Sequence, residues 1–130
     1  MSMPVQKLSA VYGVVFLLIA VLGFFLASKT MTNEPLLVLF SVNIVHNVVH
    51  AVFGVWGLIA ARTEALAQSF AQIAGVIYLV LGLLGFFTPT GFGYVHLGGH
   101  NIWLHLLLSL GLLYFGFKDS LNVDALMEEE

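Results

Sequence analysis

The sequence contains no cysteine and very little charge. The absence of cysteine from its 130 residues excludes disulfide bonds, thiolate metal ligands and redox thiols. Charged residues make up 8% of the chain, whereas a soluble domain carries about 25%. With only four Lys and Arg residues, the chain is unsuited to binding nucleic acid. Because 60% of its residues are hydrophobic, we expect the chain to lie in a lipid bilayer.

Four apolar stretches are long enough to cross a membrane. A spanning helix needs roughly 20 mainly apolar residues, and the stretches lie at about 8–27, 35–61, 70–87 and 97–117. Pro35 stands where a helix can begin, because the first turn does not need its N–H. The links are short, which favours antiparallel neighbours. We therefore expect an all-α, four-span transmembrane helical bundle, a single integral membrane domain over residues 1–130 with a short acidic cytoplasmic tail at 118–130.

The first and third stretches are related by an internal repeat. The segment GVVFLLIAVLGFF at 13–25 aligns without gaps to GVIYLVLGLLGFF at 75–87, and seven of the thirteen positions are identical. In the stretch that follows each segment, His50 and His105 occupy matching places. We therefore expect two repeated helical hairpins, related by a pseudo-two-fold axis along the membrane normal.

The basic residues predict how the chain is oriented. In the expected bundle Lys7, Arg62 and Lys118 fall on one side, and only Lys29 falls on the other. Basic residues are enriched in cytoplasmic loops. We therefore expect a multi-pass protein of the inner, cytoplasmic-type membrane with both termini in the cytoplasm.

Polar side chains follow one face of the second and fourth stretches. Their spacing of three and four residues keeps them on one side of each helix. His50 and His105 lie about 18–20 Å from the nearest basic anchors, near the midplane of a core ~30 Å thick. Polar groups at this depth face a bundle interior or a functional cavity. We call these residues the polar seam; they are Asn43, His46, Asn47, His50, Asn101, His105 and Ser109.

The three histidines of the seam have several interpretations. As structural groups, they would hydrogen-bond neighbouring helices, at about 0.6 kcal/mol per bond. As cofactor ligands, His46, His50 and His105 could hold haem iron or the magnesium of a chlorophyll-type pigment. Imidazoles also serve in proton relays and could handle a quinone. A zinc site from the same histidines ranks lower, because no cysteine or carboxylate accompanies them.

The chain shows no recognisable catalytic set. It has no Gly-rich phosphate loop, no Ser/His/Asp arrangement and no paired carboxylates. The leading hypothesis is a non-enzymatic structural or accessory component that forms a homo-oligomer or joins a larger membrane complex. The alternatives are a haem-, chlorophyll- or quinone-binding subunit that uses the histidines, and a small transporter or channel. The absence of charge inside the spans disfavours the last of these.

The motif around the histidines resembles a known family. The run N-x-x-H-N-x-x-H-x-x-x-G-x-x-G extends from Asn43 to Gly57, and further matches are Gly75, Tyr78, Gly82, Gly85, Asn101 and His105. This pattern resembles an uncharacterised bacterial family of integral membrane proteins, domain of unknown function 4383, over nearly the whole chain. The resemblance implies a four-helix bacterial membrane protein and no known activity.

Overall fold

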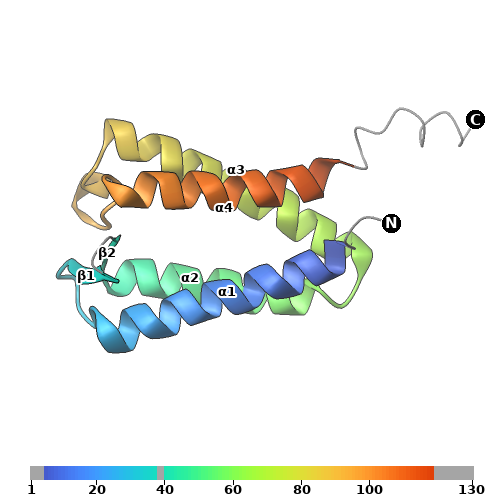
Figure 1. Cartoon of the computed structure of the whole chain (residues 1–130), viewed down its shortest axis with the longest axis horizontal. Helices are drawn as coiled ribbons and strands as arrows, with labels where there is room; N and C mark the ends of the chain where they lie inside the picture. Colours follow the sequence, from blue (N-terminus) through green and yellow to red (C-terminus); the bar gives the residue numbers. More distant parts are fainter. Residues whose placement is uncertain (1–4, 38–39, 119–130) are drawn as a thin grey trace, which may run out of the picture.

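The computed structural model describes residues 5–37 and 40–118, which form four α-helices and one short β-hairpin (Figure 1). The helices are α1 (Val5–Leu26), α2 (Ile44–Ala60), α3 (Glu64–Phe87) and α4 (His100–Phe117). Strands β1 (Glu34–Leu36) and β2 (Phe40–Val42) lie between α1 and α2, and a 3-10 turn, η1 (Gly91–Gly93), lies between α3 and α4. The predicted all-α fold class is confirmed. Apart from Lys118, the expected acidic tail lies outside the described residues.

The helices form two antiparallel hairpins that pack against each other (Figure 1). The first helical hairpin pairs α1 with α2, and the second pairs α3 with α4. The β-hairpin and η1 lie together at one end of the bundle, where α2 and α4 begin. The start of α1, the α2–α3 junction and the end of α4 lie at the opposite end. The histidine-bearing beginnings of α2 and α4 are thereby brought to the same end.

Three of these helices are long and apolar enough to cross a membrane. They are α1, α3 and α4, with 22, 24 and 18 residues, whereas α2 is an apolar helix of 17 residues. Large apolar side chains on the outside are exposed, including Leu18 at 55% and Leu110 at 60%. An outer surface of this kind suits lipid rather than water.

The structure corrects the expected beginning of the second helix. The expected start was Pro35, but Pro35 lies in β1 and pairs with Ser41 of β2 in an antiparallel register. Proline is tolerated in an edge strand as well as in the first turn of a helix. The α2 helix begins nine residues later at Ile44, where the Asn43 side chain accepts a hydrogen bond from the His46 backbone N–H at 3.0 Å.

Glycine allows the paired helices to approach closely. A methyl group added at Gly13 of α1 would lie 2.8 Å from the Leu58 backbone nitrogen and 2.9 Å from the Gly54 oxygen on α2. In the second hairpin, a methyl group at Gly75 of α3 would lie 2.9 Å from Cγ of Leu113 on α4. Small residues at such positions let membrane helices gain packing contacts. Glycine therefore permits close helix packing in both helical hairpins.

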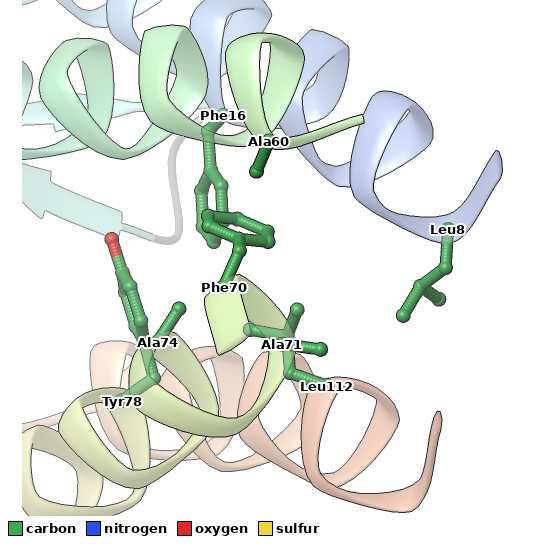
Figure 2. Close-up of a cluster of buried hydrophobic side chains, with 8 residues drawn as sticks. All are labelled: Leu8, Phe16, Ala60, Phe70, Ala71, Ala74, Tyr78 and Leu112. Carbon is green, nitrogen blue, oxygen red and sulfur yellow. The ribbon is translucent and has the colours of Figure 1, made fainter. Parts of the chain in front are cut away.

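The apolar core lies between the two hairpins. Figure 2 shows its eight buried residues, which are Leu8, Phe16, Ala60, Phe70, Ala71, Ala74, Tyr78 and Leu112. Tyr78 stands at one edge of this cluster, and its hydroxyl is directed away from α3, towards α1 and α2. The apolar core therefore ends at a polar group, and the three histidines lie beyond it.

Candidate metal centre

Three histidines from two helices converge in the interior. His46 and His50 lie one turn apart on α2, and His105 comes from α4 across the bundle. Each offers a nitrogen atom, and these three atoms lie within 4.8 Å of one another. The side chains are buried, with 4%, 1% and 2% of their surface exposed. The structure therefore brings together all three histidines that the sequence marks as candidate ligands.

Most of the imidazole nitrogens in this cluster have no hydrogen-bond partner among the described residues. Five of the six are fully buried without a hydrogen-bond partner among the described residues; the sixth belongs to His105. The backbone of Ser41 approaches the His46 ring, but outside hydrogen-bonding geometry. A buried polar group without a partner costs about 1–3 kcal/mol. A bound group that uses one lone pair of each ring would relieve part of this cost.

Tyr78 is a further polar group at this site that sequence reasoning missed. Its hydroxyl is buried and has no hydrogen-bond partner in the described part of the chain. Its ring centroid lies 5.5 Å from that of His105 and 5.9 Å from that of His50. A signal was present in the repeat, because Tyr78 aligns with Phe16 and is the only exchange that introduces a polar atom.

Aromatic stacking fixes the orientation of His50. Its ring stacks on Phe16 at 5.6 Å with an interplanar angle of 27°, and on Tyr78 at 5.9 Å and 17°. Phe16 and Tyr78 stack on each other at 5.0 Å. These three rings come from α1, α2 and α3, so the helix packing holds the imidazole in one orientation.

A small cavity adjoins the cluster. It has a volume of about 50 Å³ and is lined by the three histidines, Tyr78 and apolar residues such as Val49 and Leu81. A single water molecule needs roughly 10–15 Å³ on this measure. The cavity can therefore hold a few small atoms beside the histidines, but not a macrocycle.

The amides of the polar seam hold the loops rather than join the cluster. Asn43 caps α2 and donates to the Tyr94 carbonyl at 2.8 Å. Asn101 donates to the carbonyls of Ser41 at 2.8 Å and His96 at 3.0 Å, which ties β2 and the loop before α4 to that helix.

Two further residues of the polar seam also bond backbone carbonyls outside the cluster. The Asn47 side-chain nitrogen donates to the Ser28 carbonyl at 2.8 Å, while its Oδ1 is buried without a described partner beside Gly23. The Ser109 hydroxyl donates to the Leu106 carbonyl at 2.8 Å, within its own helix. The remaining polar side chains thus position the helices, and the unpaired nitrogens belong to the histidines.

Three neutral imidazoles are a complete set of protein ligands for one transition-metal ion. Catalytic zinc sites use three protein ligands, three histidines among them, at metal–nitrogen distances of about 2.0–2.1 Å. Tetrahedral angles then place the nitrogens about 3.3 Å apart. From mutual distances within 4.8 Å, small ring movements would bring the histidines to this geometry.

The fold and the site define the class of protein: a small helical membrane protein with a buried cluster of three histidines. The chain belongs to the family described as Domain of unknown function (DUF4383), whose profile matches residues 6–118. This match confirms the resemblance identified from the histidine motif. Neither the curated proteins nor the solved structures contain a match to the chain.

Proposed function

We propose that this protein is a non-enzymatic membrane component that binds one transition-metal ion through His46, His50 and His105. The observation that carries the proposal is the convergence of their three nitrogen atoms within 4.8 Å. The cluster is buried, and five of its six imidazole nitrogens have no partner in the described part of the chain. One ion would engage a lone pair of each imidazole at once. The sequence ranks a metal low for want of other ligands, but three imidazoles in this geometry need no cysteine or carboxylate.

The ligand chemistry selects the class of metal. Imidazole suits zinc, copper, iron and nickel, whereas magnesium and calcium require oxygen ligands. The first turn of α2 contains His46, and a cation near a helix N-terminus is disfavoured by roughly 0.3–1 kcal/mol. Structural zinc sites contribute about 10–16 kcal/mol in small peptides. Coordination therefore outweighs the helix dipole by an order of magnitude.

The size of the cavity favours an ion over the larger cofactors. Pockets for small organic ligands measure about 300–1,000 Å³. The cavity that all three histidines line has about 50 Å³, and a second cavity that His46 lines has about 180 Å³. Haem or a chlorophyll-type pigment would have to separate the helices to reach the cluster. A bare ion needs only the space between the rings.

We also infer that the two helical hairpins are a repeat. The Gln6 side chain donates to the Ala61 carbonyl at 3.1 Å, and Gln68 donates to the Gly116 carbonyl, also at 3.1 Å. Both pairs connect the beginning of the first helix of a hairpin to the end of its second. Gln68 follows Gln6 by the same 62 residues that separate the aligned segments at 13–25 and 75–87. The matching bonds support a duplicated unit.

The test is the metal content of the protein, purified in mild detergent without a polyhistidine tag and incubated with Zn²⁺. Elemental analysis should find about one zinc ion per chain. His50→Ala and His105→Ala should each lower the zinc affinity at least tenfold, because each removes a ligand. His100→Ala is the matched control, since His100 accepts a bond from Trp103 at the bundle end and should not alter zinc content. Failure of the unaltered protein to retain zinc would refute the proposal.

A further inference from the structure

Tyr78 and the cavity indicate which further ligand the proposed metal ion would bind besides the three histidines. This inference rests on the proposed function, because it concerns the coordination of the same ion. Within the described residues, the group of potential ligands consists of three histidines and no carboxylate. A tetrahedral ion therefore keeps one position that no His, Asp or Glu side chain of the group fills. Closed structural sites have four protein ligands, whereas sites with three leave a position for water or substrate.

The surroundings of the cluster define where that position faces. The cavity of about 50 Å³ is bordered by His46, His50 and His105, so it adjoins the proposed ion. Its other walls are mainly apolar, with Val45, Val49 and Leu97 among them. The volume accepts a ligand of two or three heavy atoms and excludes larger molecules.

One of the residues that line the cavity, Tyr78, carries a hydroxyl group. Tyr78 is the only lining residue besides the histidines that has a polar side chain. Its hydroxyl is buried and has no partner among the described residues. The matching position in the first hairpin is Phe16, which lacks the hydroxyl. The second hairpin therefore differs from the first in having a buried hydroxyl group at this position.

We propose that the ion bound by the three histidines keeps an open coordination position, which takes a small ligand such as water or a monoanion. Tyr78 is the positioning residue for that ligand, since its hydroxyl forms a hydrogen bond with the ligand. The apolar walls exclude ligands of more than a few atoms. The site is thus a metal centre with an exchangeable ligand rather than a closed structural site.

The experiment uses the full chain loaded with Co²⁺, whose visible spectrum reports changes in coordination, and azide as the probe ligand. Azide should alter the cobalt spectrum of the unaltered protein. Tyr78→Phe should retain cobalt and bind azide roughly three- to tenfold more weakly, the loss expected for one hydrogen bond. Tyr12→Phe is the matched control, because the Tyr12 hydroxyl donates to the Leu108 carbonyl and does not line the cavity.

A second variant tests the cavity without removing the hydroxyl. Val49→Phe should fill the cavity, retain cobalt and lose the response to azide. Size-exclusion profiles that match the unaltered protein would show that both variants fold.

Three results would contradict parts of this account. An unaltered spectrum on adding azide to the parent protein would overturn the open position. Equal azide affinity in Tyr78→Phe and in the parent protein would overturn the role of the hydroxyl. Loss of cobalt from Tyr78→Phe would also overturn it, because Tyr78 would then be a metal ligand. Failure of the parent protein to take up cobalt would instead refute the metal site itself.

Discussion

Single residues distinguish the two hairpins at their centre. The proposed repeat pairs His50 with His105, and one turn earlier it pairs His46 with Asn101. Asn101 holds β2 and the loop before α4, whereas His46 faces the other two histidines. A strictly symmetric pair of hairpins would offer two or four imidazoles. The exchange at this position leaves three, the number that a metal ion with one open position requires.

Gly13 tests the close approach of α1 and α2. Gly13→Ala would place a methyl group 2.8 Å from the Leu58 backbone nitrogen, so the helices must separate. We expect the free energy of unfolding to fall by roughly 1–3 kcal/mol, the usual cost of overpacking. Unfolding in mixed detergent micelles measures this change. Val11→Ala, on the outward face where Val11 is 50% exposed, should change stability much less. Equal stability of the two variants would contradict the close packing.

At the scale of elements, the beginning of α2 decides where the histidines stand. Asn43 ends the extended segment, caps the helix and bonds the Tyr94 carbonyl of the opposite loop. His46 therefore lies in the first turn of α2, shortly after β2 in the chain, instead of several turns into a long helix. The cap links the local structure of α2 to the position of a proposed metal ligand.

Substitution of Asn43 should loosen this first turn. Asn43→Ala removes the cap, at about 1 kcal/mol, and leaves the Tyr94 carbonyl without this donor. Hydrogen exchange should become faster at the amides of His46 and its neighbours. Asn43→Ser keeps a capping oxygen and should protect the His46 amide better than Asn43→Ala does. If all three proteins exchange alike at these amides, Asn43 does not hold the turn.

The sequence predicts the existence of the helices better than their ends. Long apolar runs identify α1, α3 and α4, because the cost of exposing backbone in lipid enforces a helix there. The segment 34–42 is as apolar as a helix, and two three-residue strands are too short to show an alternating pattern. Helical spacing therefore places Asn43 on the polar face, whereas in the structure it caps α2.

The candidate site could be predicted only in part from the sequence. Helical spacing places His46 and His50 on one face, and the repeat brings His105 to a matching place. Spacing cannot show that the side-chain amides of Asn43 and Asn101 donate hydrogen bonds to the backbone of other segments, because those segments are distant in sequence. It also cannot show that the Tyr78 hydroxyl lacks a partner, since that depends on packing between the hairpins.

For the whole molecule, one prediction concerns its orientation in the bilayer. The α2–α3 junction with Arg62 lies at the end of the bundle where α1 begins and α4 ends, opposite the β-hairpin. The excess of basic residues at that end predicts that it faces the cytoplasm. His46, in the first turn of α2, then lies nearer the outer face. The predicted association with copies of itself or with a larger complex stays a prediction.

Single cysteines can test the orientation, because the chain has none of its own. Asn33→Cys stands beside the β-hairpin and Ala65→Cys in the first turn of α3, and both sites are exposed. In intact cells a membrane-impermeant thiol reagent should label the first and spare the second. Permeabilised cells should show labelling of both. The reverse pattern in intact cells would place the termini outside.

The metal centre is tested most directly by X-ray absorption at the zinc edge of the zinc-loaded protein. The account predicts three nitrogen neighbours at about 2.0–2.1 Å with the outer-shell scattering of imidazole rings, and one further light ligand. His105→Ala should lower the imidazole contribution by a third or lose the zinc. A first shell of oxygen atoms alone, without imidazole scattering, would contradict a centre built from His46, His50 and His105.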